Sequence, residues 1–242
     1  MVLLFTAIAV GCMHTLLGPD HYLPFIVIGR ARRWGLGATS LLTFACGLGH
    51  VLSSVAIGLA GAFVGATLSR VQAWESTRGA WAGWALLVFG AAYMAWGTWR
   101  AVRRKSHDHW HLHPTGVMHH HGHAHESGHA PVHEHDHAGS PEGSVASWKS
   151  LTPWILFLIF VLGPCEPLVP LFFASAVSGT WHEVVLVTVG YSVATLATMH
   201  AVVTLMWLGL RAIPLGPLEK WSSTAAGALI LVAGVAMVFL GL

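Results

Sequence analysis

Six long apolar stretches divide the 242-residue sequence. They cover approximately residues 2–29, 35–65, 80–99, 151–178, 183–210 and 221–242. Roughly 20 apolar residues suffice to cross a bilayer as an α-helix. Asp, Glu, Lys and Arg make up only 9% of the chain, against about 25% in soluble domains. The sequence therefore predicts an all-α, multi-pass integral membrane protein with six transmembrane helices and the lipid bilayer as its surroundings.

The basic residues predict how this bundle is oriented. Ten of the 12 Lys and Arg residues lie in the connections that follow the first, third and fifth stretches. Only Arg70 and Arg78 lie between the second and third stretches. Cytoplasmic loops carry the excess of Lys and Arg. We therefore expect both termini outside and the long loop inside, in a cytoplasmic (inner) membrane. With a net charge of +2 and no basic face to follow phosphates, no nucleic-acid partner is expected.

The two ends of the sequence resemble each other. Residues 82–97 align without gaps to residues 226–241, with identical residues at seven positions that include Gly83/Gly227 and Gly90/Gly234. An odd number of helices per half places the second half upside down, as in secondary transporters. We expect two inverted three-helix repeats, residues 1–99 and 151–242, separated by a cytoplasmic His-rich loop of residues 100–150.

Breaks are expected in the first and fourth helices, where Gly18-Pro19 and Gly163-Pro164 interrupt the apolar runs. Both breaks lie about 18 Å from the cytoplasmic boundary at 1.5 Å per helical residue. Ionisable side chains at this depth are expensive and mark functional sites. The candidate metal-ligating residues are His14, Asp20, His21, His50, Cys165, Glu166 and His200.

Imidazole and carboxylate ligands together suit divalent nickel, cobalt and zinc. Two plainer roles compete with this interpretation. Asp20 is also placed to cap the half-helix that follows the break, and Cys165 is also placed to pack as a small apolar residue. Cys12 and Cys46 are interpreted as packing residues.

The loop between the halves is rich in histidine. Its candidate metal-binding residues are His119, His120, His121, His123, His125, His133, His135 and His137. Such a composition cannot bury a core and is predicted to be disordered, and His-rich tracts bind transition metals. A pH-sensing loop is the alternative.

The motif from His14 to His21, His-Thr-Leu-Leu-Gly-Pro-Asp-His, resembles the His-x4-Asp-His signature of the nickel/cobalt permease family, with five residues instead of four before the aspartate. Six helices interrupted by a His-rich loop look like the related exporters. Gly163-Pro164-Cys165-Glu166-Pro167 is similar to the urease-accessory-type transmembrane proteins. The resemblance implies metal contacts at His14, Asp20 and His21.

These observations predict a transporter of divalent transition-metal cations, not an enzyme, with no catalytic residue and no prosthetic group. Nickel or cobalt is the expected substrate, with zinc as a further candidate, and efflux is favoured because the loop is expected in the cytoplasm. The alternatives are a metal-delivery accessory protein, a thiol-electron carrier of the cytochrome c maturation type and an anion exporter. The sequence does not define an oligomeric state.

Overall fold

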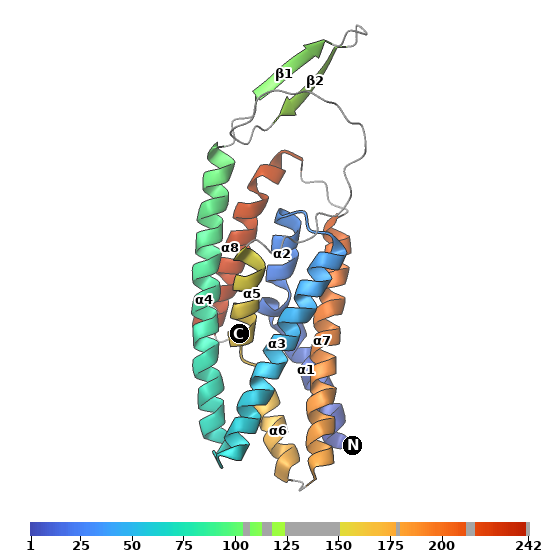
Figure 1. Ribbon diagram of the computed structural model, residues 1–242, viewed down its shortest axis with the longest axis vertical. Coiled ribbons are helices and arrows are strands. Elements are labelled where there is room, and N and C mark those ends of the chain that lie inside the picture. The colour runs from blue at the N-terminus through green and yellow to red at the C-terminus, as the bar shows by residue number, and fades with distance from the viewer. Residues whose placement is uncertain (104–106, 113–117, 124–150, 178–179, 212–215, 241–242) are drawn as a thin grey trace.

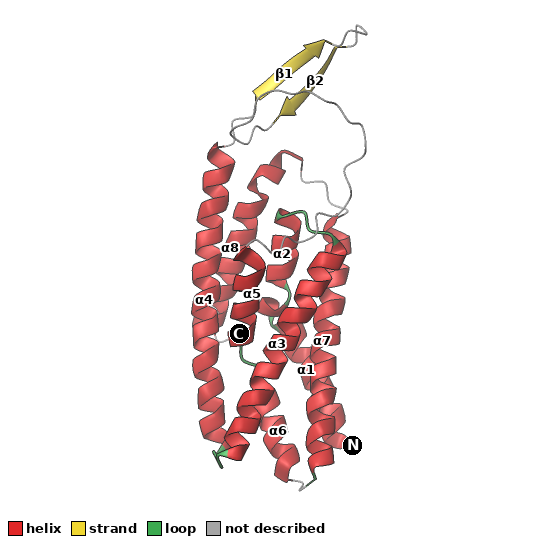
Figure 2. Cartoon of the chain, in the orientation of Figure 1, coloured by secondary structure: helices red, strands yellow, loops and turns green. Residues whose placement is uncertain are grey.

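The computed structural model describes residues 1–242 except 104–106, 113–117, 124–150, 178–179, 212–215 and 241–242. Its helices run roughly side by side in one elongated bundle, and a small strand pair lies beyond one end (Figures 1 and 2). The helical elements are α1 (Val2–Leu17), η1 (Pro19–His21), α2 (Leu23–Ala31), α3 (Leu36–Phe63), α4 (Leu68–Arg103), α5 (Leu151–Leu162), α6 (Leu168–Val177), α7 (Trp181–Arg211), η2 (Gly216–Trp221), α8 (Ser222–Val235) and η3 (Ala236–Leu240).

Most described helices carry large apolar side chains on their outer surface. Phe63 is 93% exposed and Leu205 is 69% exposed, which is an extensive apolar surface for a protein in water. Among the described residues, four helical segments are long and apolar enough to cross a membrane: Leu36–Phe63, Leu68–Arg103, Trp181–Leu210 and Glu219–Leu240. The chain is therefore a helical, membrane-embedded protein.

The first and fourth apolar stretches are each broken near the middle. The first forms α1 and α2, joined by the single 3-10 turn η1, and the fourth forms α5 and α6. Proline lacks the N–H that a continuous helix needs, and each break contains a Gly-Pro pair. Figure 1 shows the two halves of each stretch one above the other along the bundle.

Helix α4 begins twelve residues earlier than the 80–99 stretch predicts, because it starts at Leu68. Val71, Glu75, Gly79, Ala82 and Leu86 are all buried, which is the three-to-four-residue spacing of one helix face. Residues 68–79 include charged side chains and lie outside the apolar stretches expected from the sequence. Glu75 and Arg78 instead lie inside the helix as an ion pair, in a part of α4 that the 80–99 stretch did not include.

Helices α4 and α8 pack backbone to backbone through glycines. A Cβ added to Gly90 would lie 2.4 Å from the backbone nitrogen of Leu231, and one added to Gly234 would lie 2.6 Å from that of Leu87. Only glycine allows so close an approach, as in other small-residue contacts between membrane helices. Gly90 and Gly234 occupy aligned positions of the two sequence halves, so each half offers the same surface to the other.

Part of the loop that composition predicts to be disordered is described as two strands, β1 (His107–Leu112) and β2 (Met118–His123). They pair antiparallel, with His107 opposite His123 and His109 opposite His121. The pairing is local in sequence, so little chain entropy is lost in closing it. Histidine alternates with other residues in β1, a period that fits a strand.

Candidate metal centre

The break between α1 and α2 brings His14 and His21 together. Helix α1 ends at Leu17, and Gly18 is extended, with φ −89° and ψ 94°. The chain then makes the η1 turn, in which the His21 N–H donates to the Gly18 carbonyl at 3.1 Å. A Cβ at Gly18 would lie 2.5 Å from the Nδ1 atom of His21. Glycine at this position therefore leaves room for the imidazole of His21 against the backbone.

Asp20 contacts His21 instead of capping a helix. Its Oδ1 atom lies 3.2 Å from the Nδ1 atom of His21, and the N-cap residue of α2 is Tyr22, without a side-chain cap bond. The Gly18 carbonyl is 3.1 Å from the same nitrogen. Both oxygens accept a proton carried on Nδ1, which directs the lone pair of Nε2 away from them.

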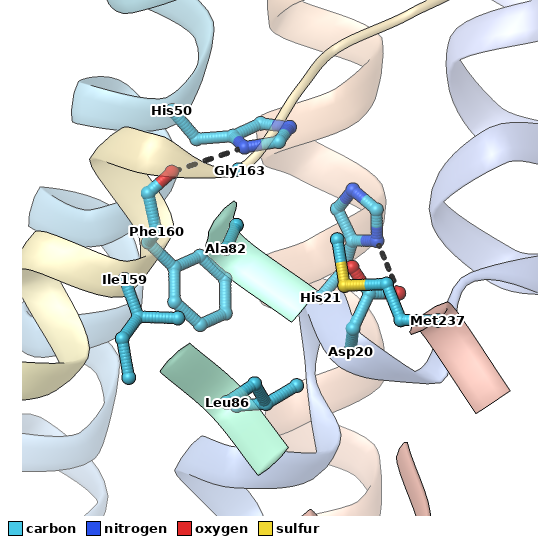
Figure 3. Close-up of a pocket in the computed structure, with 9 residues that line it drawn as sticks. All are labelled: Asp20, His21, His50, Ala82, Leu86, Ile159, Phe160, Gly163 and Met237. Atoms are coloured by element: carbon cyan, nitrogen blue, oxygen red, sulfur yellow. Dashed lines mark hydrogen bonds and ion pairs between the residues drawn. The ribbon is translucent and has the colours of Figure 1, made fainter. Parts of the chain in front are cut away.

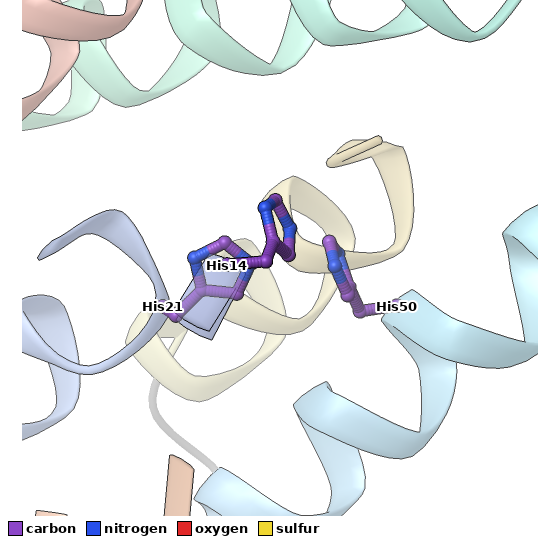
Figure 4. Close-up of side chains that lie close together, drawn as sticks. All are labelled: His14, His21 and His50. Carbon is purple, nitrogen blue, oxygen red and sulfur yellow. The ribbon is translucent and has the colours of Figure 1, made fainter. Parts of the chain in front are cut away.

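His50 approaches the same point from α3. Its ring centroid lies 5.1 Å from that of His21, and the centroids of His21 and His14 are 4.7 Å apart, each pair nearly edge to face. Figure 4 shows the three rings gathered between the elements that carry them. Each of the three offers a nitrogen atom within 4.8 Å of the other two. We call His14, His21 and His50 the histidine cluster.

The Nε2 atom of every ring in the histidine cluster is buried and has no hydrogen-bond partner among the described residues. His50 uses its Nδ1 atom to contact the Phe160 carbonyl at 3.3 Å, as His21 uses its own to contact Asp20. Metal-binding histidines are typically held in this way, with one ring nitrogen bonded to a carboxylate or carbonyl and the other free for the ion. Buried imidazole nitrogens without a partner are otherwise costly.

The spacing of the three rings is close to that of a metal site. Two nitrogens that each lie about 2.1 Å from one ion are at most about 4.2 Å apart, and the separations here reach no more than 4.8 Å. Small rotations of the rings therefore bring the histidine cluster around one ion, with Asp20 beside it as a charge-balancing carboxylate.

A pocket opens beside the histidine cluster. Asp20, His21 and His50 form its polar wall, and its other lining residues are Ala82, Leu86, Ile159, Phe160, Gly163 and Met237 (Figure 3). Residues of α4, α5 and η3 thus face residues of the first break. A Cβ at Gly163 would lie 3.1 Å from the Nδ1 atom of His50, so the second Gly-Pro break lies against the first half's histidine.

Two candidate ligands lie apart from this group. His200 is half-buried on α7, and its Nε2 atom is 2.6 Å from the Ser40 hydroxyl. Glu166 is exposed to the outside of the bundle. Neither side chain belongs to the histidine cluster: Glu166 is exposed, and His200 contacts Ser40 instead.

Cys165 is buried at the second break. Its Sγ atom lies 3.3 Å from the Tyr191 hydroxyl, and its backbone N–H donates to the Ser54 hydroxyl at 3.1 Å. The three cysteines, Cys12, Cys46 and Cys165, are all free. The thiol of Cys165 thus has a hydroxyl partner within the core and does not join the histidine cluster.

Sequence reasoning missed a polar group around the second break. Arg78 donates to the Glu75 carboxylate, to the Ser54 hydroxyl and, at 3.4 Å, to the Val161 carbonyl. The i, i+3 spacing of the two charges and the apolar period around them were signals of a buried pair on one helix face.

The loop histidines are only partly described. His119, His120, His121 and His123 lie in β2, whereas His125, His133, His135 and His137 fall outside the described residues. Backbone register places His111 opposite His119 and His109 opposite His121, so histidines occupy paired positions along the two strands.

Comparison with protein-family models, with curated proteins and with solved structures finds no match for this chain. Any function of the chain therefore has to follow from the geometry of its own residues, above all the histidine cluster.

Proposed function

We propose that the protein transports a divalent transition-metal cation, with nickel or cobalt as the leading substrates and zinc as a third. The observation that carries this proposal is the histidine cluster: three imidazoles at a helix break of a membrane-embedded bundle, each with a buried and unpartnered Nε2 atom. Imidazole ligands bind these ions in their neutral form, and Asp20 supplies a negative charge at the same place.

A transport path requires access to the ion from both sides of the membrane. In the proposed topology, six spans form two inverted repeats, with the broken α1–α2 and α5–α6 stretches as their first helices. Broken helices at the repeat interface are typical of secondary transporters. The glycine contacts between α4 and α8, which occupy aligned positions of the two halves, support this arrangement.

In the proposed orientation, the protein lies in the cytoplasmic (inner) membrane. Both termini are outside, and the His-rich loop is in the cytoplasm. Histidines of the loop would collect metal there and raise its concentration at the entrance. Efflux then follows as the favoured direction. The resemblance to nickel/cobalt permeases and exporters, carried by His14, Asp20 and His21, agrees with this proposal.

An accessory protein that only holds metal for a partner is the competing function. It needs the same histidine cluster but no path. The thiol-electron carrier is disfavoured, because Cys165 is paired with the Tyr191 hydroxyl and such a carrier needs a dithiol.

Reconstitution into vesicles tests the proposal. Flux of Ni²⁺, Co²⁺ and Zn²⁺ is followed for the wild type, for Asp20→Ala and for a cysteine-free variant. We expect flux of at least one metal in the wild type and in the cysteine-free variant, and at least a tenfold lower rate in Asp20→Ala. Binding without flux in the wild type would favour the accessory function, and equal flux in Asp20→Ala would remove Asp20 from the site.

A further inference from the structure

Glu75 and Arg78 form a buried ion pair outside the histidine cluster. The Glu75 side chain is 1% exposed and that of Arg78 is 11% exposed. One carboxylate oxygen, Oε2, accepts from the Arg78 Nη2 atom at 2.5 Å and from the Ser54 hydroxyl at 3.3 Å. The other oxygen, Oε1, is buried and has no hydrogen-bond partner among the described residues.

The ion pair and its contacts come from three elements, α3, α4 and α5, that also contribute residues to the pocket. Arg78 is one helical turn before Ala82, and Ser54 is one turn after His50; Ala82 and His50 both line the pocket. Arg78 also donates to the carbonyl of Val161, which stands between the pocket residues Phe160 and Gly163. Arg78 and Ser54 therefore each lie about one helical turn from a residue that lines the pocket.

A purely structural role explains the pair poorly. Burying two charges costs more than packing apolar residues of the same size, unless every donor and acceptor is satisfied. Here the Oε1 atom of Glu75 and the Nε atom of Arg78 lack partners among the described residues. Ionisable groups inside a membrane protein commonly serve ion or proton movement.

We propose that Glu75 carries the proton that is exchanged for the transported metal, an inference that rests on the proposed function. A proton from the solution on the release side binds the Glu75 carboxylate, and Arg78 loses its counter-charge. The uncompensated guanidinium then repels a divalent cation in the pocket, because like charges in a low-dielectric interior repel each other strongly. Return of the proton to the other side restores the pair, and the next metal ion binds.

The groups that face Glu75 are few. Arg78 is on its own helix, Ser54 is on α3, and Cys165 of the second break donates its backbone N–H to Ser54. Behind Cys165 lies the Tyr191 hydroxyl of α7. Among these neighbours, Arg78 is the one whose positive charge is balanced by the Glu75 carboxylate, so protonation of Glu75 leaves a net positive charge that disfavours metal binding.

The test compares four full-length proteins in vesicles with the membrane voltage clamped at zero: wild type, Glu75→Gln, the double variant Glu75→Gln/Arg78→Gln, and Glu183→Gln as a control at the start of α7. A gradient of one pH unit is imposed and the steady-state Co²⁺ ratio is measured. Exchange of one proton per ion through Glu75 multiplies the Co²⁺ ratio that the wild type and the control sustain by about ten, and the double variant loses this factor.

The single variant separates coupling from packing. Glu75→Gln keeps the shape but leaves Arg78 unpaired, so Co²⁺ binding is at least fivefold weaker than in the wild type. The double variant removes both charges and recovers binding to within about twofold. A double variant that still sustains the wild-type ratio would overturn the proposal. Wild-type flux that does not depend on the pH gradient would also overturn the proposal for Glu75, but it would leave the proposed transport function intact. Absence of all flux would refute the transport function itself.

Infrared difference spectra give a second measurement, in which Glu75 and Arg78 are left unchanged. Adding Co²⁺ at mildly acidic pH should remove a carboxylic-acid C=O band, and this loss should persist in Asp20→Asn. A spectrum without such a loss would contradict a proton on Glu75.

Discussion

His21 and His50 lie ring against ring, with centroids 5.1 Å apart, although one follows the break of the first apolar stretch and the other lies in the middle of α3. Each has one ring nitrogen fixed, by Asp20 and by the Phe160 carbonyl respectively. Both therefore present Nε2 to the same space. This relationship between two separate elements is what makes the histidine cluster compatible with a metal centre.

Removal of the loop is expected to weaken metal capture without abolishing transport. Deletion of residues 106–140 takes away loop histidines but no member of the histidine cluster. We expect the metal concentration needed for half-maximal flux to rise several-fold, while the maximal rate stays within about twofold. Flux measurements in vesicles over a range of Co²⁺ concentrations check this, and complete loss of transport would show that the loop is part of the path.

Loss of one cluster imidazole should weaken metal binding far more than loss of a histidine elsewhere in the bundle. Changes to residues that merely support a metal ligand cost about 10–100-fold in affinity, so His50→Ala should cost about 100-fold or more. His200→Ala is the matched control, because His200 contacts Ser40 and not the cluster. Titration of loop-deleted protein with Co²⁺, followed by visible absorbance, measures both. Similar losses in the two variants would place the site elsewhere.

Metal affinity should fall as the pH is lowered. Protonated imidazole has no lone pair for an ion, so protons and metal compete for the histidine cluster and for Asp20. The metal affinity is therefore highest at alkaline pH. It falls as the pH is lowered, by about tenfold or more per pH unit once the ligands are protonated. Co²⁺ titrations of the loop-deleted protein between about pH 8 and pH 5.5 test this. An affinity that stays constant across that range would contradict competition between protons and metal at the histidine cluster.

The contact between α4 and α8 should tolerate no added side chain. A Cβ at Gly227 would lie 2.2 Å from the backbone nitrogen of Met94, and backbone cannot turn aside as a side chain can. Gly227→Ala should lower the free energy of unfolding by about 1–3 kcal/mol. Gly209→Ala is the control, since nothing lies within 4 Å of its added Cβ, and there alanine favours the helix. Thermal unfolding in detergent, followed by circular dichroism, compares the two; equal shifts would contradict the close packing.

The helix breaks and the choice of candidate histidines could be predicted from the sequence, because both depend on local chemistry. Gly18-Pro19 and Gly163-Pro164 cannot continue a helix, and His14, His21 and His50 are conspicuous in apolar runs. Their convergence was not accessible, since it depends on how α3 crosses the first break. For the same reason the sequence could not separate His50, which reaches the pocket, from His200, which binds Ser40.

Glu75 and Arg78 show a different limit. The third apolar stretch was expected to begin only at residue 80, because an isolated charge within a membrane helix is unfavourable. Two opposite charges three residues apart neutralise each other on one helix face, and Ser54 from α3 adds a further bond. That partner is distant in sequence, so composition alone excluded a segment that the tertiary structure accommodates.

The most direct test of the central claim is X-ray absorption of the loop-deleted protein loaded with one equivalent of Co²⁺. We predict scattering from about three imidazole rings around the ion, and a loss of one ring's contribution in His50→Ala but not in His200→Ala. A loop-deleted protein that retains no Co²⁺, or a spectrum that His50→Ala leaves unchanged, would contradict a metal centre at His14, His21 and His50.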